Sequence, residues 1–480
     1  MKKLVLLYLC LPLLANAQKW VDTTYPIKID RDSVYGTAYD FAGNLETLTM
    51  DIAYPTNDTP PICGRPLAVI LYGGAWMGGS KNDNEVQRLM QDFAKRGYVA
   101  IAPNYRLGMF QTAAAWNCNI SSLFNVEWNC LNAQDTAEWY RAYYRAIQDI
   151  KGAIRYSRHL VLENAEINMQ NIFVTGFSAG GFNALGVAFL DHESEWKTFA
   201  NAMNTAQAPN AIYDNGCVKK YQWDTSIASM NLSRPSLGSL QGDLNLPRYP
   251  QRIRAVGNFY GGMLFNLLDS SYYGDKEPAI YSFHQPNDLI VPYKSNRKVF
   301  DGFNTCAYSV CNQGILNRPY VHSSTTIRDW CADLKNAGKN YPDFYFDSTL
   351  NNTDCAGQIA DPSKGGHQLD NWQRTWNMAA FFATKIDTTD CLIIDGIEQE
   401  NALIFSLYPN PSFGELTINS LLEVQEIIIF ASDGKEVLRQ TTLNLYRNSM
   451  DISSLENGFY YVLVKGNHLQ GIQKLVVQKW

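Results

Sequence analysis

Residues 171–185 read NIFVTGFSAGGFNAL, in which an apolar, β-branched run ends in a glycine-flanked serine and small residues follow. This order is typical of a strand that passes into a helix through one sharp turn, with Ser178 at its centre. Gly176 and Gly180, two residues to either side, carry no side chains that would clash there. Such a turn strains the backbone of the serine and lifts its hydroxyl clear of the sheet. We therefore predict that Ser178 is a nucleophile, although G-x-S-x-G alone also occurs in turns that bind phosphate.

Uninterrupted apolar runs recur between residues 25 and 385, separated by segments with helical periodicity. Uninterrupted rather than alternating runs are typical of strands buried on both faces of a parallel sheet. Their alternation with helices predicts an α/β fold, with a mostly parallel central sheet flanked by helices. The runs are 67–72, 98–102, 172–175, 255–260 and 279–283.

The helix expected after Asp135 shows two faces. Its apolar residues recur at steps of three and four, and its charged residues fall largely between them, on the other face. We therefore expect an amphipathic helix. The apolar set is Tyr140, Tyr143, Ile147, Ile150 and Ile154, and the charged set is Arg141, Arg145, Asp149 and Arg155.

The two ends of the chain differ from its middle. Residues 1–17 combine a basic start, a short apolar run and an A-x-A ending, which predicts a secretory signal peptide cut after Ala17. The run is too short for a transmembrane helix. A large α/β domain is predicted at 18–388 and a linker at 389–403. Short alternating strands and turns then predict a small antiparallel β-sandwich at 404–480.

Charge and cysteine content exclude some functions. The net charge of -6 and the pI near 5.6 give no basic patch, which argues against nucleic acid as a partner. Ten cysteines fit an oxidising compartment. The spacing of Cys306 and Cys311 lacks the matching second pair of a zinc site, so disulfides are favoured and no metal is predicted. The cysteines expected to brace loops are Cys118, Cys130, Cys306, Cys311, Cys331 and Cys355.

A serine nucleophile needs a base and an orienting acid, and on α/β sheets these follow it in the order acid, then histidine. His367 stands in a Gly-Gly-His loop directly before a helical pattern, and it is the predicted base. Asp288 lies in a loop at the carboxyl end of a predicted strand, where functional groups gather, and it is the predicted acid. Asp269 and Asp275 are alternatives without a strand directly ahead of them. His284 is expected to shape the loop of Asp288 rather than to catalyse.

A glycine-rich loop, LYGGAWMGGSK at residues 71–81, follows the first of the central strands. The backbone N–H groups of Gly74 and Ala75, joined by that of Ala179, are predicted to form an oxyanion hole. No G-K-[ST] follows in Walker spacing, so a phosphate loop is disfavoured. Trp76 and Tyr105 are expected to contact the substrate or to support the pocket.

Taken together, these motifs resemble the carboxylesterase and hormone-sensitive-lipase-like branch of the α/β-hydrolases over residues 45–385. The resemblance implies an eight-stranded, mostly parallel sheet and a serine hydrolase that cleaves carboxylic esters through an acyl-enzyme without a cofactor. Ser178, Asp288 and His367 match the family's triad. Two positions depart from its pattern, since Tyr72 replaces a histidine and Ala75 replaces a glycine.

The last segment, from LYPNPSFGELTI at 407–418 to KLVVQKW at 474–480, resembles the C-terminal sorting domain of the type IX secretion system of Bacteroidota. The resemblance implies export through the periplasm to the cell surface or the medium, with the type IX machinery as partner. A carbohydrate-binding sandwich is the alternative, on the expectation that Tyr460 and Tyr461 are exposed.

These observations predict a secreted serine esterase acting on a small-molecule or polysaccharide-linked ester. A serine peptidase of the prolyl oligopeptidase type shares the fold and the triad, but it usually carries a large additional N-terminal domain. A surface binding protein on an inactive hydrolase scaffold is the alternative from a different functional class.

Overall fold

The computed structural model divides the chain into two compact units, Met1–Cys391 and Leu392–Trp480. The predicted signal peptide at 1–17 and the predicted linker at 389–403 lie outside the described residues, so their boundaries stay predictions. The structure describes residues 19–41, 44–61, 63–108, 136–160, 162, 165–195, 205–206, 230–231, 236–246, 252–268, 278–294, 297–302, 319–349, 365–387, 405–420, 424–441, 447–466 and 470–479.

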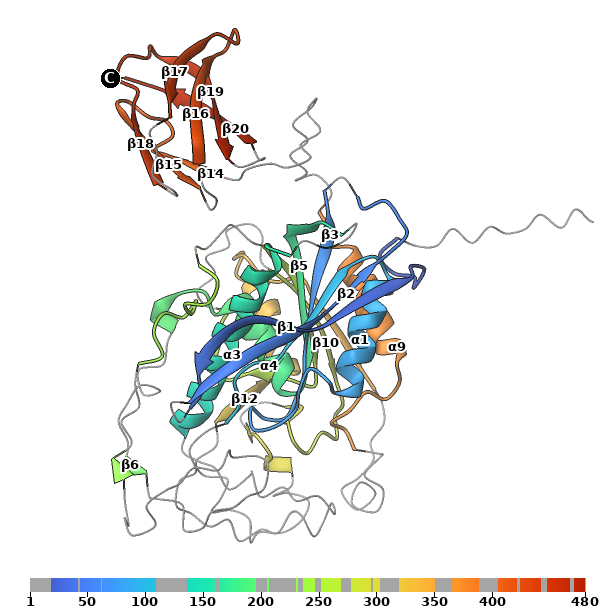
Figure 1. Cartoon of the computed structure of the whole chain (residues 1–480). Coiled ribbons are helices and arrows are strands. Elements are labelled where there is room, and N and C mark those ends of the chain that lie inside the picture. Colours follow the sequence, from blue (N-terminus) through green and yellow to red (C-terminus); the bar gives the residue numbers. More distant parts are fainter. Residues whose placement is uncertain are drawn as a thin grey trace, which may run out of the picture. The chain divides into compact units, whose positions relative to one another are not determined.

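An eight-stranded sheet in the order β1-β2-β4-β3-β5-β8-β10-β13 forms the centre of the first unit (Figure 1). Its last six strands in this order run parallel, and β1 and β2 add an antiparallel edge. The predicted fold class is therefore confirmed, and the uninterrupted apolar runs are the buried central strands, as expected. The strands are β1 Ile27–Tyr39, β2 Leu45–Pro55, β3 Arg65–Leu71, β4 Val99–Pro103, β5 Ile167–Phe177, β8 Ile253–Phe259, β10 Ala279–His284 and β13 Phe344–Ser348.

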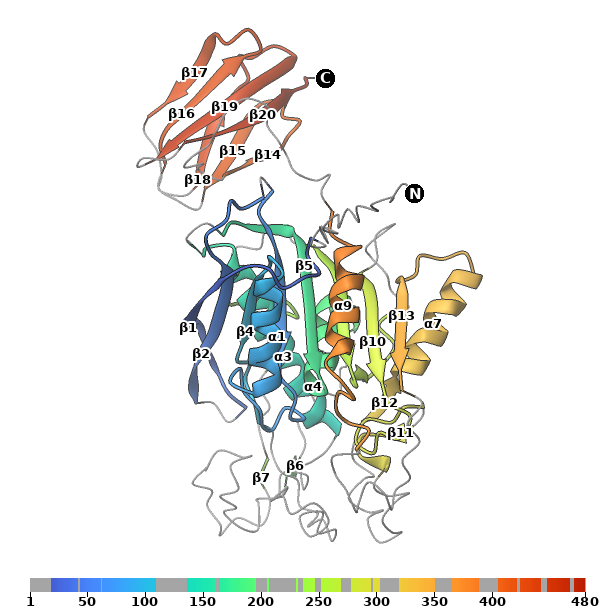
Figure 2. The ribbon, with the colours of Figure 1, turned by 90° about the vertical axis from the view of Figure 1, so that its right-hand side faces the viewer.

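Helices cover both faces of this sheet. The helices α1 (Asn84–Lys95) and α9 (Gln373–Ala383) lie on one face, and α3 (Thr136–Ser157) and α4 (Ala179–Phe189) lie on the other (Figures 1 and 2). Among the described residues, no helix combines the length and the hydropathy needed to cross a membrane. The remaining elements are α7 Ser324–Asn336, the short helix Glu193–Glu195, and strands β6 Thr205–Ala206, β7 Met230–Asn231, β9 Gly262–Met263, β11 Arg297–Lys298 and β12 Tyr320–Ser323.

The charged face of α3 differs from the prediction, because it is buried instead of facing solvent. Asp149 accepts hydrogen bonds from the backbone and the guanidinium of Arg106. Arg155 and Gln148 donate to backbone carbonyls of the segment 236–246. That segment has no strand or helix to satisfy its carbonyls, and the long polar side chains of α3 supply the donors. The helical periodicity was predicted correctly. The segment 236–246, which covers the charged face of α3, lies about 90 residues away in the sequence.

The second unit consists of two antiparallel sheets, β14-β15-β18 and β17-β16-β19-β20. Their apolar side chains share one core, which confirms the predicted sandwich. Tyr461 is 43% exposed, but Tyr460 is only 9% exposed and packs inward, so the expected pair of surface tyrosines is reduced to one. The strands are β14 Phe405–Tyr408, β15 Glu415–Ser420, β16 Val424–Ala431, β17 Glu436–Gln440, β18 Arg447–Asp451, β19 Gly458–Gly466 and β20 Gln470–Val477.

The cysteines for which disulfides are predicted, except Cys331, lie outside the described residues. Cys331 is buried in α7. The predicted disulfides therefore stay a prediction.

The turn between β5 and α4 has the strained geometry that its sequence predicts. Ser178 adopts φ 55° and ψ -119°, a region of backbone angles that residues other than glycine rarely occupy. A Cβ on Gly176 would lie 2.4 Å from the carbonyl carbon of Gly180, and a Cβ on Gly180 would lie 2.5 Å from the carbonyl oxygen of Leu71. Both positions therefore require glycine because backbone atoms, which cannot rotate away, occupy the space.

The substitution Gly180→Ala tests this packing. We expect it to lower the free energy of unfolding by about 1–3 kcal/mol, because β3 must move away from α4 to admit the methyl group. Gly78→Ala is the matched control, since a Cβ there meets nothing within 4 Å. Thermal unfolding of both variants measures the difference. Equal melting temperatures for the two variants would contradict the account of this turn.

Candidate active site

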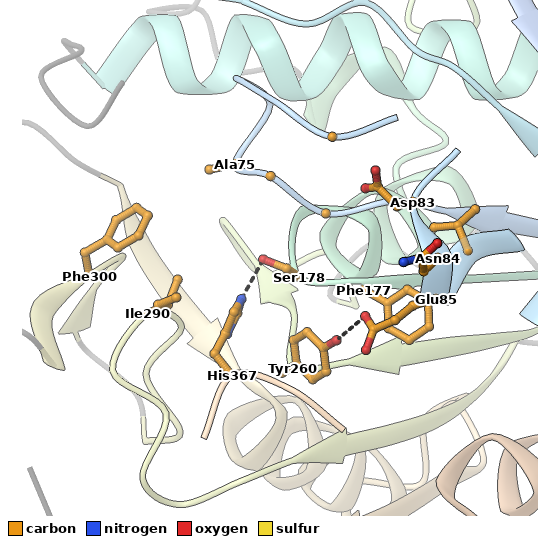
Figure 3. A pocket seen from close by; sticks show the side chains of 14 residues that line it. Ala75, Asp83, Asn84, Glu85, Phe177, Ser178, Tyr260, Ile290, Phe300 and His367 are labelled. Atoms are coloured by element: carbon orange, nitrogen blue, oxygen red, sulfur yellow. Dashed lines mark hydrogen bonds between the residues drawn. The ribbon is translucent and has the colours of Figure 1, made fainter. Parts of the chain in front are cut away.

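The three side chains predicted to form a triad lie in one hydrogen-bonded row at the carboxyl end of the sheet. Figure 3 shows the hydrogen bond between Ser178 and His367. The Ser178 hydroxyl lies 2.8 Å from His367 Nε2, and His367 Nδ1 lies 2.8 Å from Asp288 Oδ2. Ser178 follows β5, Asp288 follows β10, and His367 stands in the loop before α9. The row fits a His367 tautomer that donates from Nδ1 and accepts the serine proton on Nε2.

The Asp288 carboxylate is buried and fully engaged. Its Oδ1 accepts hydrogen bonds from the backbone N–H groups of Ile290 (2.8 Å) and Val291 (2.9 Å). Burial by itself raises the pKa of this carboxyl. The charge of His367 and the hydrogen bonds from His284 and His367 outweigh burial and hold the pKa below its ordinary value. Asp288 is thus an anion suited to orient and stabilise a protonated imidazole.

The glycine-rich loop after β3 presents backbone N–H groups beside Ser178. Gly74, Ala75 and Trp76 all have positive φ, at 107°, 53° and 58°. The turn closes with hydrogen bonds from the N–H groups of Met77 and Gly78 to the Gly74 carbonyl. Within the part of the chain that the structure describes, the N–H groups of Gly74, Ala75 and Ala179 donate to no other backbone group. These three donors are available for a ligand oxygen.

Trp76 and Tyr105 do not appear among the described residues that line the pocket. The Tyr105 ring stacks on Tyr72 at 4.2 Å, its hydroxyl donates to the Tyr72 carbonyl, and the Tyr72 hydroxyl donates to the Tyr105 carbonyl. Trp76 Nε1 donates to Asn183 Oδ1 of α4 at 2.8 Å. Of the two roles that the sequence left open, support of the loop is the one that these contacts provide.

The far end of the same loop is held by an ion pair that the sequence analysis did not identify. The buried Lys81 ammonium lies 2.6 Å from Asp51 Oδ1 of β2 and 2.7 Å from Asp32 Oδ1 of β1. Its backbone N–H donates to Asn104 Oδ1. Both ends of the loop are therefore fixed to the sheet, which keeps its strained residues in place.

A pocket of about 310 Å³ opens on Ser178 and His367. Ile290 and Phe300 lie on one side of the Ser178–His367 pair, and Glu85 with its neighbours lies on the other (Figure 3). The lining residues are Gly73, Gly74, Ala75, Gly79, Asp83, Asn84, Glu85, Val86, Phe177, Ser178, Tyr260, Ile290, Phe300 and His367.

The polar side of the pocket was missed by the sequence analysis. The Tyr260 hydroxyl donates to Glu85 Oε2 at 3.4 Å, and its ring meets the His367 ring edge-on at 4.8 Å. The protein around Glu85 displaces water and raises the pKa of its carboxyl above the ordinary value, against the opposing effects of Tyr260 and His367. One signal for Tyr260 was available, since it directly follows a central strand.

Two family models match the chain. Residues 50–121 match the BD-FAE family, an esterase-like α/β-hydrolase domain, and residues 406–478 match the secretion system C-terminal sorting domain. Residues 50–121 are thus similar to an esterase-like α/β-hydrolase domain and lie in the unit with the mostly parallel sheet, and residues 406–478 are similar to a secretion sorting domain. The sorting domain indicates a secreted or cell-surface protein of the Bacteroidota type. No curated protein matches the chain.

Several solved esterase structures are similar to the chain. Thermogutta terrifontis esterase 2 phosphorylated by paraoxon is 18% identical, with a TM-score of 0.34, and the match covers 75% of this chain and 93% of that chain. Esterase B from Lactobacillus rhamnosis, inhibited by a C6-C4 SN3 compound, is 13% identical, with a TM-score of 0.35, and the match covers 76% of this chain and 90% of that chain.

The carboxylate of Glu85 should discriminate against anionic esters. We expect Glu85→Gln to raise kcat/KM for 4-nitrophenyl hemisuccinate relative to 4-nitrophenyl acetate by about threefold to tenfold, since like charges near a wet surface repel by about 1 kcal/mol. The raised pKa means that the wild-type preference should fade as the pH falls, and should do so at a higher pH than an ordinary glutamate would give. Steady-state kinetics from pH 5 to pH 8 measures both effects.

Glu166→Gln is the control, because Glu166 is exposed and directly precedes β5, at the opposite edge of the sheet. An unchanged preference in Glu85→Gln, or the same change in both variants, would contradict a role of Glu85 in selecting substrates.

Proposed function

We propose that the protein is a secreted serine esterase that cleaves carboxylic esters through an acyl-enzyme. The observation that carries the proposal is the hydrogen-bonded row Ser178–His367–Asp288, which opens on a pocket beside the loop donors. In this arrangement the histidine can remove the proton of the serine hydroxyl and the aspartate can orient the histidine, which makes the hydroxyl a nucleophile at neutral pH. The BD-FAE match supports ester bonds as the target.

The proposed reaction begins when Ser178 Oγ attacks the ester carbonyl carbon and its proton passes to His367 Nε2. Asp288 stabilises the imidazolium that results, and the N–H groups of Gly74, Ala75 and Ala179 receive the negative oxygen. Collapse of the tetrahedral intermediate breaks the bond to the alcohol, which leaves with the proton from His367. Water then attacks the acyl carbon as His367 Nε2 takes its proton. The bond from the acyl carbon to Ser178 Oγ breaks, Oγ receives that proton from His367, and the carboxylic acid leaves.

The pocket favours a small ester group. Its volume of about 310 Å³ lies at the lower end of the range of ligand sites, about 300–1,000 Å³. The apolar side chains of Ile290 and Phe300 and the carboxylate of Glu85 face the reacting centre from opposite sides. We therefore propose an uncharged ester, free or attached to a polysaccharide, of which only the region around the ester bond enters the pocket.

We also propose a separate role for each segment of the chain. Residues 1–17 direct export and are removed, 18–388 catalyse, 389–403 connect, and 404–480 are recognised by the type IX secretion machinery. The proposed disulfides form after export, in an oxidising compartment. The match at 406–478 supports the sorting role.

Ser178→Ala and Asp288→Asn test the triad directly. We expect Ser178→Ala to lower kcat for 4-nitrophenyl acetate and butyrate by about 10⁴-fold or more, and Asp288→Asn by about 10⁴-fold, because the first removes the nucleophile and the second removes the charge that orients His367. Ser194→Ala, an exposed serine outside the pocket, is the control. Wild-type rates in Ser178→Ala would refute the proposal, and hydrolysis of matched anilides but not of esters would favour a peptidase.

A chain that ends after Cys391 tests the domain assignment. All the residues of the proposed site lie in the first unit, so kcat/KM for 4-nitrophenyl butyrate should stay within about twofold of the full chain. Export from a bacterium with a type IX system should be lost, because the sorting domain is missing. Loss of activity from the correctly folded fragment would show that the second unit contributes to catalysis.

A further inference from the structure

A second histidine contacts the carboxylate that orients the proposed base. His284 ends β10, its side chain is fully buried, and its Nε2 lies 3.1 Å from Asp288 Oδ2 and 3.0 Å from the Val291 carbonyl oxygen. Both of these partners can only accept a hydrogen bond. The nitrogen between them must therefore carry a proton. Asp288 Oδ2 thus accepts from two imidazoles, His284 on one side and His367 on the other.

The other side of His284 determines its remaining proton. Nδ1 lies 3.1 Å from Ser324 Oγ. Asn258 Nδ2 donates to Ser282 Oγ at 2.9 Å, and Ser282 Oγ in turn donates to Ser324 Oγ at 2.8 Å. The hydroxyl proton of Ser324 is then directed at His284 Nδ1, which accepts it. This count of donors and acceptors gives a neutral imidazole with its single proton on Nε2.

The groups that face His284 from the neighbouring elements agree with this assignment. The titratable ones are Asp288, His367 beyond it, and Tyr293, whose ring meets the His284 ring edge-on at 5.5 Å. From α7 and β8 come the polar, uncharged side chains of Ser324 and Asn258, and Ser348 at the end of β13 donates to the His284 backbone carbonyl at 2.8 Å. The donors therefore run in one direction, from Asn258 through the two serines and His284 to Asp288.

We propose that His284 is a positioning residue of the active site, a fixed neutral donor that holds Asp288 Oδ2 in line with His367. Resting on the proposed esterase function, the proposal adds a residue that acts only through the triad acid. The hydrogen bond from His284 fixes the position of Oδ2, so that the carboxylate of Asp288 stays directed at His367 Nδ1. It also keeps the carboxylate from rotating away from His367 Nδ1.

Two substitutions separate this role from simple packing. His284→Leu fills the space but has no donor, whereas His284→Gln places an amide nitrogen near the position of Nε2. We expect His284→Leu to lower kcat for 4-nitrophenyl acetate by about 10-fold to 100-fold, with KM within about twofold. Losses of this size are typical at metal sites when a residue that orients a metal ligand through a hydrogen bond is removed. The acidic limb of its kcat/KM profile should move to lower pH, because a carboxylate that is free to rotate stabilises the imidazolium form of His367 less. His284→Gln should recover most of kcat and the wild-type limb.

The control is His322→Gln, since His322 is a partly buried histidine of β12 that packs on Trp330, away from Asp288. Equal losses in His284→Leu and His284→Gln with an unmoved limb would overturn the proposal in favour of a packing role. Wild-type kinetics in His284→Leu would overturn it as well.

A measurement on the wild-type protein is independent of activity. The ring nitrogens of His284 can be observed by NMR in protein labelled with ¹⁵N-histidine, and they are identified as the resonances that are missing from His284→Gln. At pH 8 their chemical shifts should be those of a neutral imidazole protonated on Nε2. A proton on Nδ1 would overturn the proposal even if the esterase function stands. If the tautomer is as expected but Ser178→Ala retains full turnover, the esterase function fails and the hydrogen-bonded placement of His284 stands.

Discussion

The structure depends on the close approach of three backbone segments around Ser178. The end of β3, the start of α4 and the last residues of β5 come so near to one another that Gly176 and Gly180 admit no side chain. This contact holds Ser178 at φ 55°, with its hydroxyl directed away from the sheet and toward His367. Because buried backbone is hard to displace, the surrounding core keeps the strained turn in place. The same approach brings the loop after β3 beside the serine, so that one packing constraint positions both the hydroxyl and the N–H donors.

The second requirement of this site is a buried negative charge, that of Asp288. Hydrogen-bond donors close to Asp288 stabilise this charge. An isolated buried carboxylate is strongly unfavourable, so Asp288 has to be supplied with donors. Two come from the backbone of its own loop and two from histidines, one of them outside the usual row of three. A carboxylate satisfied in this way stays ionised and stays in place, which are the two properties that the proposed base requires of it. The polar network from β8 and α7 extends that order into the core.

The sequence predicted the parts of the site that short patterns encode. Strand ends and a glycine-flanked serine were enough to pick out Ser178, Asp288 and His367, which the structure brings together from three different loops. Contacts between distant segments could not be predicted in this way. The burial of the charged face of α3, the supporting contacts of Trp76 and Tyr105, and the Glu85–Tyr260 pair all depend on which segments pack against which. A single sequence shows periodicity and residue type, but it does not show those partners.

Trapping the acyl-enzyme tests the central claim most directly. The full chain would be mixed rapidly with 4-nitrophenyl butyrate, quenched in acid, digested and examined by mass spectrometry. We expect a butyryl group on the peptide that contains Ser178, formed at the rate of the initial burst of nitrophenol and absent from Ser178→Ala. A butyryl group on another residue, or turnover of the ester with no acylated peptide at any time, would contradict the account.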